Sequence, residues 1–138
     1  MRLANIRQYI FSKHCHPISA WSRLITTPLL LVPAWKRDPL QTAGVAAWFA
    51  VNPVMTPAPK HHRAFATRAM LGEELWSAEP ASDRTLIGIN AVGTIVLGTA
   101  MIAAWKRRPV PAAIAIASSM VMTLVSWQRY AAIFDRQS

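Results

Sequence analysis

Four long runs of apolar residues divide the chain and predict its architecture. The third run, residues 85–105, contains no charged residue, and neither does the fourth, residues 109–128. A helix rises about 1.5 Å per residue, so about 20 residues cross the roughly 30 Å hydrocarbon core of a bilayer. The first two runs cover residues 18–35 and 39–56. This pattern predicts an all-α integral membrane protein with four transmembrane helices in two hairpins.

The first two runs give a weaker signal than the last two. Residues 18–35 contain one cation, Arg23, and two prolines, Pro28 and Pro33. Proline is tolerated in membrane helices because neighbouring groups satisfy the backbone that it leaves unpaired. A buried hairpin of a soluble protein is the alternative, and the tryptophans near the ends of the runs, where membrane interfaces place them, argue against it.

The two short connections have nearly the same sequence. Residues 34–39 read AWKRDP and residues 104–109 read AWKRRP. Proline suits the first position of a helix, because the N–H that it lacks would be unpaired there anyway. We therefore expect two tight turns on the same side of the membrane. Internal duplication and independent selection of this turn chemistry both explain the repeat.

The other segments are expected at the membrane surface, within a single membrane domain, residues 1–138. Residues 1–13 place their apolar side chains on one helical face, which is typical of an interfacial helix. The connection 57–84 contains an amphipathic stretch, residues 63–77, and Arg68 falls within its apolar face. Snorkelling of this arginine to a lipid phosphate is one explanation for that position.

A stripe of small and apolar residues predicts how the third helix packs. It consists of Gly88, Ala91, Ile95, Gly98 and Ile102. Small residues let two membrane helices approach closely. We therefore expect this stripe to contact the fourth helix.

The excess of basic over acidic residues indicates which partners the chain binds. The chain has 15 Lys and Arg against 6 Asp and Glu, a net charge of +9, and 53% apolar residues. Such a basic excess in a soluble domain would suggest nucleic acid. Here the cations flank the apolar runs, so we expect the lipid bilayer as partner and no nucleic acid. The apolar content excludes a disordered chain, and the single cysteine, Cys15, excludes a disulfide scaffold.

Cations near the ends of the spans predict the orientation. Nine lie on the side of the termini and the long connection, and five lie, more densely, on the side of the turns. Cytoplasmic loops of membrane proteins are enriched in Lys and Arg. We expect the termini in the cytoplasm and the chain in the cytoplasmic (inner) membrane of a prokaryote.

Polar residues at one depth indicate a binding site on the side of the termini. Arg23, Asn52 and Asn90 each lie about five residues inside the end of a span, and Arg68 lies in the adjoining connection. Charged groups at membrane depth are costly and usually face a bundle interior or a water-filled cavity. These four residues are the predicted ligand-binding set, with an anionic lipid headgroup or a small anion as the ligand. Snorkelling of Arg23 is the alternative.

Acid–base chemistry is conceivable on the same side, and whether the protein is an enzyme stays open. The candidate catalytic residues are Glu73, His16 and His61, as a carboxylate and histidine pair. The sequence has no HExxH or CxxC motif, and adjacent residues such as His61 and His62 do not converge on one ion. We therefore expect no metal and no cofactor.

A set of motifs over about residues 14–77 resembles a known family. The set reads His16-Pro17, Ser19, Trp21, Arg23, Pro28, Asn52-Pro53, Pro57, Pro59, Ala69 to Glu73, and Trp76. It is similar to an uncharacterised family of small integral membrane proteins of bacteria and archaea, a domain of unknown function. The resemblance implies a membrane location and supplies no reaction.

Three functions are compatible with these patterns. The first is a polar site at the membrane interface for an anionic headgroup or ligand. The second is a non-catalytic accessory or assembly subunit that binds copies of itself or a membrane partner. The third, a small proton-coupled transporter, is weaker because no Asp or Glu lies within a span.

Overall fold

The structure is a computed structural model that describes residue 6, residue 9 and residues 12–137. These residues form helices and no strand, which confirms the all-α prediction. The α-helices are α2 (Pro17–Ile25), α3 (Leu31–Lys36), α4 (Pro39–Met55), α5 (Phe65–Ala78), α6 (Arg84–Trp105) and α7 (Pro109–Gln137). Two 3₁₀ turns join them, η1 (Thr27–Leu30) and η2 (Pro80–Asp83). The interfacial helix expected over residues 1–13 lies mostly outside the described residues.

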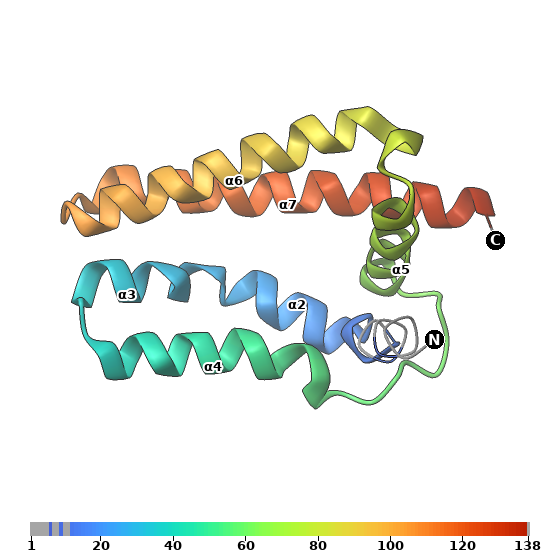
Figure 1. The fold of residues 1–138 in the computed structure, drawn as a ribbon, viewed down its shortest axis with the longest axis horizontal. Helices are drawn as coiled ribbons and strands as arrows, with labels where there is room; N and C mark the ends of the chain where they lie inside the picture. The colour runs from blue at the N-terminus through green and yellow to red at the C-terminus, as the bar shows by residue number, and fades with distance from the viewer. Residues whose placement is uncertain (1–5, 7–8, 10–11, 138) are drawn as a thin grey trace.

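Two helical hairpins lie side by side, and α5 crosses one end of them (Figure 1). α6 and α7 form one hairpin, and α2, η1 and α3 together form the other with α4. The segment from α2 to α3 lies between α4 and the α6–α7 pair. Both short turns lie at the end opposite α5, as their shared sequence predicts.

The first apolar run is not one continuous helix. α2 ends at Ile25, and the chain passes through η1 before α3 begins. Pro28 explains the break, because proline lacks an N–H and its ring clashes with the preceding helical turn. The hydroxyls of Thr26 and Thr27 donate to the carbonyls of Ser22 and Arg23, at 2.6 and 3.0 Å. The Ser22 carbonyl also accepts from the backbone N–H of Thr26 at 2.9 Å, so the Arg23 carbonyl is the one that gains a hydroxyl donor in place of a helical N–H.

Two helices in the described part of the chain are long and apolar enough to cross a membrane. They cover Pro80–Trp105 and Pro109–Gln137. The helix expected over residues 85–105 is α6, and α7 continues nine residues beyond the expected end at residue 128. The helices of the first hairpin are shorter. In the described residues, two helices are therefore long enough to cross a membrane, whereas the apolar runs predict four.

Large apolar side chains are exposed on both hairpins. They include Leu40, Val51 and Met55 on α4, Val92 and Ile95 on α6, and Ile114 and Val121 on α7. α4 is the extreme case, because Asn52 is the one residue of this helix that is fully buried. Contiguous exposed apolar surface of this kind marks a face for a membrane or for a partner.

The stripe predicted to hold α6 against α7 faces outward. Gly88 and Gly98 have no neighbouring atom within 4 Å of the position that a Cβ would take. Ile95 is 68% exposed. The side that contacts α7 carries Leu86, Ala100, Ala103 and Ala104 instead, all of them buried. The prediction of the contact face was wrong, because a helix that is apolar all round does not specify its buried side by periodicity.

Gly72 allows α5 to pack closely against α7, because glycine has no side chain. A Cβ added to Gly72 would lie 1.8 Å from the carbonyl oxygen of Tyr130. The contact brings Ala69 and Met70 of α5 into the largest buried cluster, together with Trp127 and Tyr130 of α7. The position of α5, and of every side chain that it carries, therefore depends on this close backbone approach.

The two short turns interlock. Arg37 and Arg107 both adopt left-handed backbone conformations, with φ of 56° and 57°. The guanidinium of Arg37 lies 4.1 Å from the ring centroid of Trp105 and donates to the Trp105 carbonyl at 2.6 Å. In return, the guanidinium of Arg107 lies 5.9 Å from the ring centroid of Trp35. We call these four residues the turn clasp. The clasp joins the two hairpins at the end opposite α5.

Candidate functional site

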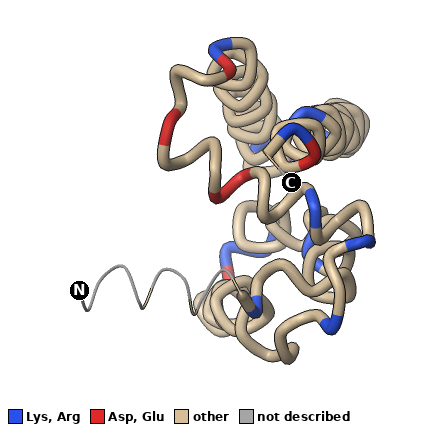
Figure 2. The backbone as a smooth tube through the Cα atoms, turned by 90° about the vertical axis from the view of Figure 1, so that its right-hand side faces the viewer, with Lys and Arg blue, Asp and Glu red and all other residues tan. Residues whose placement is uncertain are grey.

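Glu73 of α5 faces two cavities at the end of the molecule that α5 crosses. The smaller one, which we call the Arg23 cavity, has a volume of about 190 Å³. The larger one, the Asn90 cavity, has a volume of about 340 Å³. Glu73, Thr123 and Trp127 line both of them. Figure 2 faces this end and shows acidic and basic residues together there.

Arg23 lines the Arg23 cavity from α2. Its Nη1 contacts both ring nitrogens of His14, and its Nη2 donates to the His14 carbonyl at 3.4 Å. Nη2 also lies 3.7 Å from Sδ of Met70 on α5. Among the described residues, no carboxylate lies within 4.0 Å of Arg23. The cation is thus half-buried beside a cavity, and it forms no ion pair within the described part of the chain.

His14 is neutral at physiological pH in this position. Burial, and to a smaller extent the charge of Arg23, lower the pKa of His14 to about 4. A neutral imidazole accepts a hydrogen bond from the guanidinium and leaves its positive charge uncompensated. His14 therefore orients Arg23 without neutralising it.

Glu73 is the acidic group nearest to this charge. Burial raises the pKa of Glu73, and the positive charge of Arg23 offsets part of that rise. Within the described part of the chain, the Glu73 carboxylate forms neither an ion pair nor a hydrogen bond. A half-buried carboxyl with a raised pKa, open to two cavities, is able to take up and release a proton.

Asn90 lines the larger cavity from α6. Its Nδ2 donates to the Tyr130 hydroxyl at 2.7 Å, and its Oδ1 accepts from the Ser126 hydroxyl at 2.9 Å. Ser119 and Thr94 add hydroxyls to the same wall. The Asn90 cavity therefore offers fixed, uncharged hydrogen-bonding groups on the far side of Glu73 from Arg23.

Asn52 lies in a polar layer between α4 and α2. Its Oδ1 accepts from Ser19 at 3.1 Å, and its Nδ2 donates to Ser22 at 2.8 Å. One turn earlier on α4, Trp48 donates to the hydroxyl of Thr26 at 2.8 Å. Asn52 lines neither cavity, so its contacts fix the helix that carries Arg23.

Arg68 points away from both cavities. Its Nη1 forms an ion pair with Asp135 near the end of α7, at 2.6 Å. Its Nε is buried and has no hydrogen-bond partner. The structure thus separates Arg68 from Arg23, although both fall where the sequence has apolar neighbours.

The two candidate histidines lie together at another place. His16 caps α2, since its Nδ1 accepts from the backbone N–H of Ile18 at 3.3 Å. His16 and His61 line a separate surface pocket with Pro57 and Pro59. Neither histidine lines a cavity with Glu73. The histidine that the structure brings to Arg23 is His14. The only signal for it in the sequence was its expected position on the side of the termini.

Metal ligands do not gather in the described residues, where no group of three His, Cys, Asp or Glu side chains could hold an ion. The linings of the two cavities together supply one arginine, one carboxyl, the imidazole of His14 and a set of hydroxyl and amide groups.

The sequence profile of a family of unknown function, DUF6653, matches residues 5–106. The chain belongs to this family. The match includes the segment from α2 to α6 and therefore Arg23, Asn52, Glu73 and Asn90, whereas the wall that α7 contributes lies beyond it. No match is found among curated proteins or among solved structures. Membership in the family brings no reaction, so the function must be argued from the site.

Proposed function

We propose that this chain is an integral membrane protein whose Arg23 cavity binds an anionic group, carried by a lipid headgroup or by a small soluble ligand. The two long apolar helices and the exposed apolar residues of α4, α6 and α7 support a bilayer around both hairpins. In that setting α5 lies near the interface, on the side of the termini. Both hairpins would then pass through the membrane, which makes four crossings.

The observation that carries this proposal is a cation that forms no ion pair with any described carboxylate. Arg23 lines a cavity, its nearest polar neighbour is the neutral His14, and no carboxylate of the described chain pairs with it. A charged group at membrane depth is costly unless it is paired or serves a site. An anion in the cavity would supply the missing charge and would meet the guanidinium in charge-assisted hydrogen bonds.

The other predicted residues have distinct roles in this proposal. Glu73 holds or releases a proton beside the anion. Asn90 orients an uncharged part of the ligand from the neighbouring cavity. Asn52 and Arg68 act at a distance: Asn52 fixes α2 against α4, and Arg68 ties α5 to the end of α7.

The test compares Arg23→Ala with Arg84→Ala in the full chain. Arg84 is an exposed cation at the start of α6 and lines neither cavity, so its variant loses the same charge. Native mass spectrometry from a mild detergent would count anionic adducts. We expect Arg23→Ala to lose one adduct, with retention of about a tenth or less, since a charge-assisted bond contributes about 1.5–3 kcal/mol. Arg84→Ala should keep this adduct.

Two further measurements complete the test. An adduct with the mass of a phospholipid would identify a lipid headgroup as the ligand. An adduct with the mass of a small anion, which is lost when the protein is dialysed, would identify a soluble ligand. Membranes washed with alkaline carbonate should retain the protein. An unchanged adduct in Arg23→Ala, or release of the protein by carbonate, would contradict the proposal.

A non-catalytic assembly subunit is the second candidate. The polar layer of Ser19, Ser22 and Asn52 satisfies its own hydrogen bonds, and α4 exposes most of its apolar surface. This function predicts that Arg23→Ala changes the assembly of the protein and leaves its adducts unchanged.

A further inference from the structure

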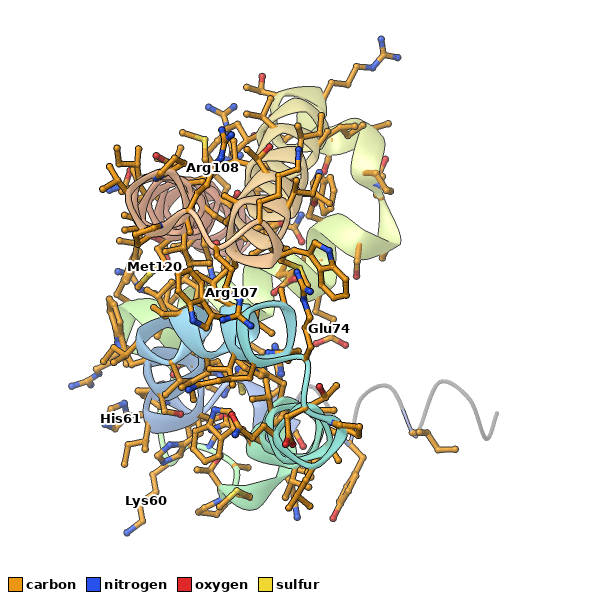
Figure 3. All side chains as sticks on the ribbon, turned by 90° about the vertical axis from the view of Figure 1, so that its left-hand side faces the viewer. Lys60, His61, Glu74, Arg107, Arg108 and Met120 are labelled. Atoms are coloured by element: carbon orange, nitrogen blue, oxygen red, sulfur yellow. The ribbon has the colours of Figure 1, made fainter. Side chains whose placement is uncertain are left out.

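The end of the molecule that carries the two short turns is strongly positive. Its five cations, all exposed, are Lys36, Arg37, Lys106, Arg107 and Arg108. Asp38 is the one acid in the two turns, and its carboxylate caps α4 by accepting from the backbone N–H of Gln41 at 2.8 Å. Figure 3 faces this end and shows Arg107 between the two turns and Arg108 near the start of α7.

These cations have few partners of opposite charge. In the described residues, neither Lys36 nor Arg108 forms an ion pair. Arg37 and Arg107 are held over tryptophan rings by the turn clasp, which fixes the position of both guanidinium groups without neutralising them. The result is a preorganised cationic surface.

An apolar groove begins at the same end. It has a volume of about 660 Å³ and lies between α3, α4 and α6. Ala34, Ala43, Ala46 and Met101 line it, together with Arg37 and Asp38 of the first turn. Leu40, at the start of α4, is 82% exposed. The groove and the cationic surface are therefore continuous.

We propose that an acidic phospholipid binds here, with its phosphate against the cations of the turns and one acyl chain in the groove between α4 and α6. A soluble anion would use the cations and leave the groove empty. A second copy of the chain would bring the same five cations to this end and would be repelled. This proposal rests on the membrane location proposed above but not on the Arg23 cavity.

The test uses the full chain in nanodiscs of phosphatidylcholine with a minor fraction of phosphatidylglycerol. Phosphatidylglycerol retained after release into mild detergent would be counted by native mass spectrometry. The double variant Lys36→Gln, Arg108→Gln removes two charges and leaves the turn clasp intact. A cation near an acidic membrane surface contributes about fivefold in affinity. We therefore expect affinity for one phosphatidylglycerol to fall by roughly 20-fold in this variant.

A matched control removes the same charge at the opposite end. Lys60 and Arg63 are exposed cations of the long connection, and the variant Lys60→Gln, Arg63→Gln should retain this phosphatidylglycerol. The groove is tested separately by Ala46→Phe, which fills it, against Ala50→Phe, which adds the same ring to α4 outside it. We expect only Ala46→Phe to lose the lipid.

Several results would overturn this proposal. Equal retention of phosphatidylcholine and phosphatidylglycerol would show that the cations do not select an acidic lipid. Full retention in Ala46→Phe would remove the role of the groove, and a dimer that Ala46→Phe dissociates would assign the groove to a second copy. Arg23→Ala should keep this lipid, so failure here and failure of the Arg23 cavity give different adduct patterns.

Discussion

The guanidinium of Arg23 and the carboxyl of Glu73 share one cavity and do not form an ion pair. Each still acts on the other, because the positive charge of Arg23 opposes the rise that burial causes in the pKa of Glu73. The charge state of Glu73 therefore sets how strongly the cavity attracts an anion. Protonation makes the carboxyl neutral and leaves Arg23 as the dominant charge.

This arrangement predicts that anion binding depends on pH. Burial raises the pKa of Glu73, so the carboxyl becomes neutral on acidification earlier than an exposed carboxyl does. Anion affinity should then increase as the pH falls through the raised pKa of Glu73, above the range in which an exposed glutamate titrates. His14, with a pKa of about 4, stays neutral through this transition and contributes no slope. Titration of adduct retention against pH measures the effect.

The matched variant for this prediction is Glu73→Gln. It should bind the anion with an affinity close to that of the acidified wild type, and the affinity should no longer change with pH. Glu74→Gln provides the control, because Glu74 is the neighbouring carboxyl on α5 and lines neither cavity. A pH slope that persists in Glu73→Gln would assign the titration to another group.

The sequence identifies Arg23 as unusual but does not identify its neighbours. Its position inside an apolar run is visible along the chain, and the predicted alternation of spans puts it on the same side as Glu73 and His14. Which of several polar residues on that side meet is decided by the angle at which α5 crosses the bundle. No local pattern encodes that angle, so Arg68 and His61 were predicted near the site and lie elsewhere.

At the scale of the helices, the close contact of α5 with α7 decides where Glu73 lies. Gly72→Ala would place a methyl carbon where it overlaps the Tyr130 carbonyl, and the backbone must move to admit it. Overpacking of this kind costs about 1–3 kcal/mol. We expect the variant to lower the free energy of unfolding by about 3 kcal/mol, at the upper end of that range, and to displace Glu73 from both cavities. Chemical denaturation in detergent would measure the loss.

Gly44→Ala is the matched control for that substitution. Gly44 lies in α4 with no atom within 4 Å of a Cβ position, so alanine meets open space there. Alanine is a better helix former than glycine by about 1 kcal/mol. The control should therefore be as stable as the wild type or more stable. Equal effects of both substitutions would show that the close approach of α5 to α7 does not limit stability.

The elements were predictable where one signal dominates. α6 and the start of α7 follow directly from uncharged runs bounded by proline and cations. The division of the first run at Pro28 was not predicted, because a proline either kinks a helix or ends it, and the hydroxyls of Thr26 and Thr27 stabilise the ended form here. The contact face of α6 was not predictable, since apolar residues surround that helix.

Across the whole molecule, charge is distributed unevenly between the two ends. Five of the six acids lie in the part of the chain that folds around α5, and the turns carry five cations against Asp38 alone. The composition gives only the net charge of +9. The fold divides that charge into a mixed end, which holds the Arg23 cavity, and a positive end, which holds the proposed lipid site.

Each half of the chain contributes one arginine and one tryptophan to the turn clasp, so the clasp joins the two halves. The halves are connected covalently through residues 57–64, a segment without a helix. Two separate fragments, residues 1–60 and 61–138, should therefore associate when they are produced together and restore the adduct pattern of the intact chain. Copurification through a tag on one fragment measures this complementation. Substitution of both Trp35 and Trp105 by leucine should reduce it. The same change at Trp48, whose indole donates to Thr26 of its own fragment, removes no part of the joint.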